Sequence, residues 1–202
     1  MARANFVKAA RKKNPVANPG ESYWWWQLYR GRKQFSKERP RPSQLTGSAK
    51  KSQLYAAQEN LEDFELDYQD ASGLSGAISE AGSEVEGLAD EWEESQQGQE
   101  EAFPGSENAE RMGELADGHR ELAQELEEVA GEVDSHVDEM PEEPDPEPEE
   151  QEDISKEQYE ADHAEWEAEQ EDYESRKAAW DSELDDLKQR ALDAFGNHEL
   201  EW

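Results

Sequence analysis

Aromatic and cationic side chains lie beside one another near the start of the chain, in the stretch ESYWWWQLYRGRKQF from residue 21 to residue 35. Indole rings stack on unpaired bases, and guanidinium and ammonium groups bind phosphates. This combination therefore indicates a surface that binds nucleic acid. The residues of the stretch that would make such contacts are Trp24, Trp25, Trp26, Arg30, Arg32 and Lys33.

The same tryptophans also have a purely structural interpretation, because a small domain with few aliphatic residues can build its core from aromatic rings. On a strand, Trp25 shares one face with Tyr23 and Tyr29, whereas Trp24 and Trp26 share the other. We expect one face to pack on the helix that follows, which leaves the other face to be explained. An aromatic core explains the rings, but it explains the basic turn less well.

A second group of cations precedes this stretch. Residues 1–20 are basic and irregular, and Pro15, Pro19 and Gly20 break any helix that starts at Phe6. We expect an arm or loop that follows the phosphates of a nucleic acid. Its cations are Arg3, Lys8, Arg11, Lys12 and Lys13.

The segment GESYWWWQLYRGRKQFSKERPRPSQLT, residues 20–46, resembles the start of small phage and bacterial proteins that have no known activity. Those proteins open with a basic arm and continue with a Gly-Glu-Ser-Tyr aromatic strand, a basic glycine turn and a Pro-x-Pro-Ser-Gln-Leu-Thr segment. More distantly, the segment is similar to the arm-type DNA-binding modules of phage integrases, which implies a small sheet with an aromatic, basic face. The likeness covers about residues 4–46, and no recombinase catalytic domain follows.

Charge is segregated along the chain. Residues 1–58 contain 13 Lys and Arg residues and two acidic residues, a net charge of +11. Residues 59–202 contain 7 Lys and Arg residues and 51 acidic residues, a net charge of −44, so the whole chain carries −33. Opposite charges imply different partners. We expect nucleic acid, either DNA or RNA, to bind the first region and a basic protein to bind the second.

The acidic region has more than one interpretation. Its carboxylates can simply solvate helices, or they can imitate the phosphates of a duplex. Imitation would make the protein an acidic inhibitor or decoy of a nucleic-acid-binding protein, and a structural coiled-coil assembly protein is a further alternative. We also expect the acidic helices to compete with nucleic acid for the basic residues at low ionic strength, since tethering raises the effective concentration of the competitor. That competition would be autoinhibition.

Strand and turn formers predict the elements that position these residues. Residues 23–29 and 33–36 are expected to form a β-hairpin with a flexible glycine turn between them. Two prolines then hold the chain extended, and a helix is expected to begin at Ser43 or Ser48 and to end near Leu66. Its candidate core residues are Leu54, Leu61 and Phe64.

Three long apolar seams follow, with the steps of three and four residues that are typical of packed helices. The first two are separated by Pro104 and Gly105, with Ser106 as a helix cap, which predicts an antiparallel helical hairpin. The third begins after Ser155, spans roughly 40 residues and is expected to stop at Gly196. The seam residues are Leu74, Ile78, Ala81, Val85, Leu88 and Trp92; Met112, Leu115, His119, Leu122, Leu126, Val129 and Val133; and Tyr159, His163, Trp166, Gln170, Tyr173, Lys177, Trp180, Leu184, Leu187 and Ala191.

The sequence thus predicts an α+β protein that is mostly α, with a small N-terminal β-hairpin plus helix followed by long acidic coiled-coil-like helices. Four parts are expected. They are a basic module at 1–66, an acidic helical hairpin at 67–139, an extended linker rich in proline and acid at 140–154, and a long helix at 155–202. The helices are expected to pack either as three within one chain or between the chains of a homodimer.

Composition argues against several classes of protein. The chain has no cysteine, which excludes disulfides and thiolate metal sites. It has no apolar run long enough to cross a membrane and no apolar segment of a secretory signal, so we expect a cytoplasmic protein without membrane contact. No catalytic or nucleotide-binding motif occurs. We therefore expect a non-enzymatic, nucleic-acid-associated accessory protein without metal or cofactor, for which the resemblance implies a phage or bacterial origin.

Overall fold

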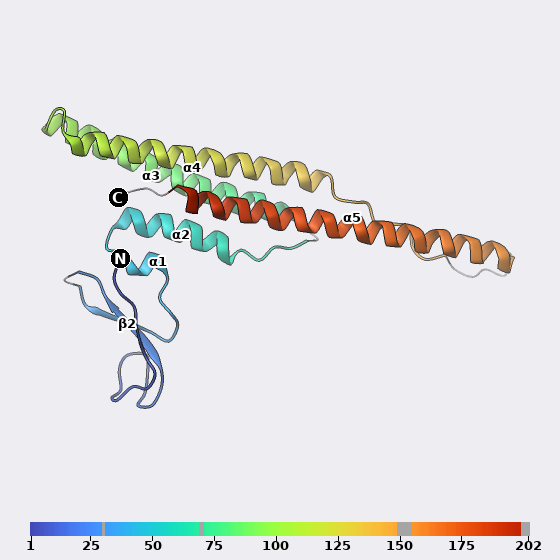
Figure 1. Ribbon diagram of the computed structural model, residues 1–202, viewed down its shortest axis with the longest axis horizontal. Coiled ribbons are helices and arrows are strands. Elements are labelled where there is room, and N and C mark those ends of the chain that lie inside the picture. The colour runs from blue at the N-terminus through green and yellow to red at the C-terminus, as the bar shows by residue number, and fades with distance from the viewer. Residues whose placement is uncertain (30, 69–70, 149–154, 199–202) are drawn as a thin grey trace.

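The computed structural model describes residues 1–29, 31–68, 71–148 and 155–198. A small sheet formed by the N-terminal residues lies to one side of an elongated set of helices (Figure 1). The protein is α+β and mostly helical, which confirms the predicted fold class.

The sheet is antiparallel and has three strands in the order β1-β2-β3. They are β1 (Asn5–Val7), β2 (Tyr23–Gln27) and β3 (Lys33–Ser36). Strands β2 and β3 form the predicted hairpin, with Trp25 opposite Phe35. Strand β1 corrects the expectation of an irregular arm, because Phe6 pairs with Trp24. Three residues are too few to show an alternating pattern, and they become a strand because β2 has a second edge whose backbone groups need partners.

The segment between the sheet and Leu66 forms two helices, whereas one helix was predicted. Helix α1 (Pro42–Leu45) ends before the extended residue Thr46, and helix α2 (Ala49–Asp63) begins after Ser48, whose side chain accepts a hydrogen bond from the Lys51 amide. Helix α2 ends before the predicted boundary at Leu66. Of the three candidate core residues, Leu61 is buried, and Leu54 and Phe64 are partly buried against the same core.

Helices α3 (Ser72–Ala102) and α4 (Glu107–Asp138) form the predicted antiparallel hairpin. Gly105 has a positive φ of 73° in the turn, and the Ser106 side chain accepts a hydrogen bond from the Ala109 amide. The predicted seams are buried from Leu74 to Leu88 and from Leu115 to Val133. Heptad spacing therefore located the core of this hairpin correctly.

Helix α5 (Lys156–Asn197) packs on α4 and α2 through its second half only. Its seam is buried from Trp180 onward, whereas the seam residues from Tyr159 to Lys177 remain partly exposed. In Figure 1 the first half of α5 projects beyond the end of α4. The predicted stop at Gly196 is wrong by one residue, because Asn197 is still helical. Helices α2 to α5 share one core within a single chain.

A reciprocal contact joins the end of α4 to the middle of α5. The indole Nε1 of Trp180 donates to the His136 carbonyl at 2.8 Å, and the imidazole Nε2 of His136 lies 2.9 Å from the Trp180 carbonyl. The two rings are stacked, with centroids 5.2 Å apart. This contact fixes where α5 leaves the helical core.

The linker returns along the projecting half of α5. The Trp166 indole Nε1 donates to the Asp145 carbonyl at 2.9 Å, and the His163 imidazole Nε2 lies 3.2 Å from a Glu147 carboxylate oxygen. Residues 140–148 form neither helix nor strand. The rest of the predicted linker, 149–154, lies outside the described residues.

Candidate nucleic-acid interface

The register of the sheet separates the aromatic residues onto two faces. One face, here called the Trp26 face, carries Phe6, Trp24 and Trp26. The opposite face, here called the Trp25 face, is formed by side chains from all three strands: Asn5, Val7, Tyr23, Trp25, Gln27, Lys33 and Phe35. The three consecutive tryptophans therefore do not form one cluster.

The Trp26 face supports the fold of the module. The Trp26 side chain is buried, with 6% of its surface exposed, and its indole Nε1 donates to the Gln44 carbonyl of α1 at 3.0 Å. Trp24 is partly exposed and lies against Phe6, with ring centroids 4.9 Å apart. The Arg39 guanidinium lies 6.0 Å from the centroid of the Trp24 ring. Trp26 is thus placed as a core residue, and Trp24 stands at the border of that core.

The Trp25 face has no buried side chain, and its rings are partly exposed. The Lys33 ammonium lies 4.4 Å from the centroid of the Trp25 ring, within the range of a cation–π contact. Tyr23 and Phe35 are 6.0 Å apart and tilted by 43°. Tyr23 and Phe35 were not among the predicted contact residues. A hairpin register centred on residue 30 would have found Phe35, because it places Phe35 opposite Trp25.

Most of the predicted cations are exposed around this sheet. None of the seven named below forms an ion pair with another described residue. Arg30 lies outside the described residues. The exposed cations are Arg3, Lys8, Arg11, Lys12, Lys13, Arg32 and Lys33.

Two other cations of the module, Lys37 and Arg41, are paired with nearby carboxylates. The Lys37 ammonium lies 2.6 Å from a Glu21 carboxylate oxygen, and this hydrogen bond lowers the pKa of Glu21. Arg41 pairs with Asp63 of α2, which raises the pKa of the guanidinium. The seven cations without ion pairs therefore leave a net positive potential on and beside the sheet.

Helix α1 and helix α2 hold the module against the helical core. The backbone N–H and the hydroxyl of Ser43 donate to the two carboxylate oxygens of Glu59, at 2.9 and 2.6 Å. The hydroxyl of Ser52 donates to the Ser43 carbonyl at 2.9 Å. Glu59 is buried, and two donors from one serine satisfy its charge. These contacts join α1 to α2, and the arm is tied to α1 as well, because the Ala2 amide donates to the Leu45 carbonyl.

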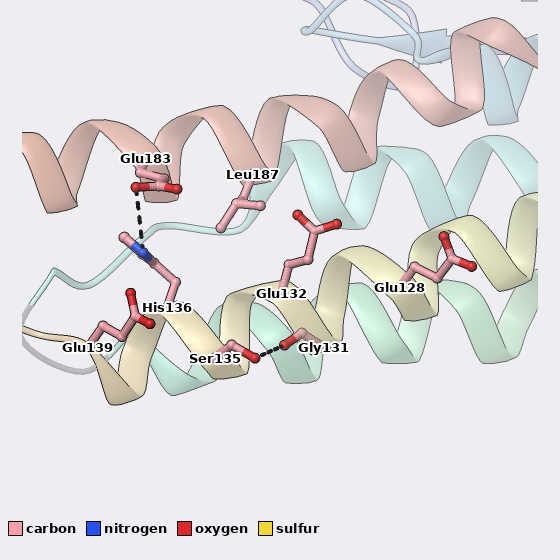
Figure 2. A pocket seen from close by; sticks show the side chains of 8 residues that line it. All are labelled: Glu128, Gly131, Glu132, Ser135, His136, Glu139, Glu183 and Leu187. Atoms are coloured by element: carbon pink, nitrogen blue, oxygen red, sulfur yellow. Dashed lines mark hydrogen bonds and ion pairs between the residues drawn. The ribbon is translucent and has the colours of Figure 1, made fainter.

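A groove lined by carboxylates lies between α4 and α5, on a different part of the molecule (Figure 2). It encloses about 580 Å³. Glu183 of α5 faces His136 of α4 across it, with the carboxylate 3.7 Å from the imidazole Nδ1. Arg190 pairs with Glu132 and lowers the pKa of that carboxyl group. The lining residues are Glu128, Gly131, Glu132, Ser135, His136, Glu139, Glu183 and Leu187.

A second hollow of about 520 Å³ lies between the linker and α5 and shares Glu139 with the first. It adds four further carboxylates and several apolar groups. Together the two hollows are called the acidic groove here. The additional lining residues are Met140, Pro141, Glu142, Glu143, Pro144, Glu169, Asp172 and Arg176.

Comparisons of the chain with protein-family models, with curated proteins and with solved structures each give no match. The resemblance of residues 4–46 to phage and bacterial modules therefore stays a prediction. Within the described residues, no helix has both the length and the apolar character needed to cross a bilayer. The same residues include no group of three or more His, Asp or Glu side chains placed to hold a metal ion.

Proposed function

We propose that the protein is a non-enzymatic, nucleic-acid-associated accessory protein that binds its ligand through the N-terminal sheet and basic arm. The observation that carries this proposal is the Trp25 face, where partly exposed rings from two strands lie beside cations that have no carboxylate partner. Stacking on the rings and phosphate contact with the cations are the two interactions that such a surface provides.

The distribution of ion pairs supports this assignment of the two regions. In the acidic helices, Arg120 contacts Glu93, Lys177 contacts Asp181, and Arg190 contacts Glu132. These cations are neutralised locally. The cations of the arm and of β3 are not, so they remain available for a polyanion.

The test measures binding of the full-length protein to labelled oligonucleotides by fluorescence anisotropy over a series of salt concentrations. Replacing Lys12 and Lys13 together by Ala should weaken binding and flatten the salt dependence, because each lost phosphate contact lowers the slope by roughly 0.7 to 0.9. The matched control replaces Lys156 and Arg176, two ion-paired cations of α5, and removes the same charge. A control that loses as much affinity as the arm variant would contradict the proposed site.

A second candidate function is the binding of a basic protein segment in the acidic groove. It is favoured because carboxylates and apolar groups such as Met140 and Pro141 line the same groove. The Lys and Arg side chains of a basic segment combine a charged group with an apolar methylene chain, so they match such a lining. In this function the protein acts as a partner or decoy of a nucleic-acid-binding protein. A labelled oligo-arginine peptide should bind the protein and should be displaced by salt. The double variant Glu139→Gln, Glu142→Gln should bind this peptide more weakly. Unchanged affinity in that variant would exclude the groove.

A further inference from the structure

We propose that the Trp25 face selects unpaired bases, so that the preferred ligand of this protein is single-stranded nucleic acid rather than a duplex. This inference rests on the proposed function and specifies its ligand. Three features of the molecule support it: the side chains on the face, the width of the sheet and the charge of the rest of the chain.

The face has few side chains that could read the edges of paired bases. A duplex is read in its grooves by hydrogen-bond donors and acceptors. The face has two amide side chains, and both already donate to the backbone. Asn5 Nδ2 donates to the Arg3 carbonyl at 3.0 Å, and Gln27 Nε2 donates to the Gly31 carbonyl at 2.8 Å. What remains on the face is mainly aromatic.

Aromatic rings bind bases through their π surfaces, which are accessible only when a base is unpaired. Trp25, Tyr23 and Phe35 are partly exposed and come from two adjacent strands. Lys33 lies over the Trp25 ring, so its ammonium group would move aside when a base stacks on that side of the ring and would stay close to the phosphate of that base. The face thus offers stacking and charge at one place, without sequence readout.

The width of the sheet also disfavours a duplex. Three strands span about 10 Å between the outer backbones before side chains are added. The major groove is about 12 Å wide and admits a helix or a two-stranded ribbon. A three-stranded sheet with large rings is wider than such a ribbon, so lying flat against base edges would require the groove to widen, which costs deformation energy. A flexible single strand can instead lay its bases across the sheet.

The acidic region disfavours a stiff ligand further. A duplex is stiff over about 150 base pairs, so it could not curve away from helices of strongly negative charge beside its path. Residues 59–202 carry a net charge of −44. A single strand can bend away from those helices on either side of the sheet.

The experiment uses the full-length wild-type protein and three probes at one salt concentration. They are oligothymidylate of about 20 nucleotides, longer than one binding site, the abasic strand of equal length, and a duplex of equal length. Oligothymidylate should bind at least tenfold more tightly than either of the others. Equal affinity for the abasic strand would overturn the stacking contact, and equal or tighter binding of the duplex would overturn the selectivity. If no probe bound, the proposed function itself would fail.

Variants locate the contact. Trp25→Leu should weaken oligothymidylate binding by about 5- to 150-fold, the range that loss of one stacked base implies, with the salt dependence unchanged. Trp25→Phe, which keeps a π surface, should restore most of the affinity. The matched control is Phe103→Leu, which removes an exposed ring at the far turn between α3 and α4. If Trp25→Phe bound oligothymidylate no more tightly than Trp25→Leu, the stacking contact would be contradicted. It would also be contradicted if Phe103→Leu lost as much affinity as Trp25→Leu.

Discussion

At the scale of single residues, the three consecutive tryptophans have different roles because neighbouring side chains of a strand point to opposite faces. Trp26 is buried against α1, whereas Trp25 lies on the face without buried side chains. Trp26→Ala should therefore unfold the sheet module, since removing a buried tryptophan costs about 3 to 5 kcal/mol. Trp25→Ala should leave the module folded. Urea unfolding, followed by near-ultraviolet circular dichroism, distinguishes the two variants. Similar losses of unfolding free energy in both would contradict the different roles of Trp25 and Trp26.

The alternation of faces could be predicted from the sequence, but which face packs could not. That choice depends on α1, whose Gln44 carbonyl accepts the Trp26 hydrogen bond from a distance of 18 residues along the chain. Sequence reasoning also included Trp26 among the contact residues and omitted Tyr23 and Phe35. A local pattern gives no information about which tertiary neighbour covers a face.

His119 is a buried titratable residue of the helical core. Burial lowers its pKa, and the nearby positive charges of Lys50 and His198 lower it further, against the opposing hydrogen bond to the Leu115 carbonyl. The folded pKa is thus below the unfolded value of about 6.5. Its contribution to stability is complete above that pH and is lost as the pH falls from 6.5 toward the folded pKa.

The change His119→Gln removes this titration and leaves the carboxylates in place. The free energy of unfolding should fall more in the wild type than in the variant between about pH 7.5 and about pH 5.5, on either side of the unfolded pKa of histidine. Urea denaturation at both pH values measures the difference. Equal losses of unfolding free energy in the wild type and the variant would show that His119 does not contribute to the pH dependence of stability.

At the scale of elements, the spacing of apolar residues predicted the helices more reliably than their packing. The seams of α3 and α4 are buried as expected, because each helix has a partner along most of its length. The seam of α5 continues through Tyr159, Trp166 and Tyr173, but this half projects beyond α4 and has no buried residue. Periodicity shows that a helix has an apolar stripe, and it does not show how far the partner helix extends. Strand β1 was missed for a related reason, since its pairing partner is distant in sequence.

Trp180 joins the packed half of α5 to α4, and it is 5% exposed. Trp180→Ala removes a large buried ring and leaves the His136 carbonyl without its donor, so it should destabilise the docking of α5 by about 3 to 5 kcal/mol. Trp166→Ala, on the projecting half, should have little effect on global unfolding. Hydrogen exchange of the amides of residues 180–195 should increase only in the first variant. Equal exchange in both variants would contradict the assigned roles of the two halves.

At the scale of the whole molecule, charge separates a cationic sheet from anionic helices, and no described cation of the arm or of β3 pairs with those helices. The described residues therefore include no direct contact for autoinhibition, and long-range repulsion of nucleic acid remains the expected effect. Replacing Glu165, Glu167, Glu169 and Glu171 by Gln should raise the association rate at low salt. The increase should disappear at high salt, where the Debye length falls to about 3 Å. Stopped-flow kinetics measures this, and an increase that persists at high salt would indicate a structural effect.

The central claim is that nucleic acid contacts the Trp25 face and the basic arm. Photo-cross-linking tests it most directly. The full-length protein is irradiated with a single strand that carries 5-iodouridine, and the adducts are located by mass spectrometry of the peptides. The account predicts adducts on Tyr23, Trp25 or Phe35, and their loss when unlabelled strand competes. Adducts confined to α3, α4 or α5, or no adducts at concentrations that saturate binding, would contradict it.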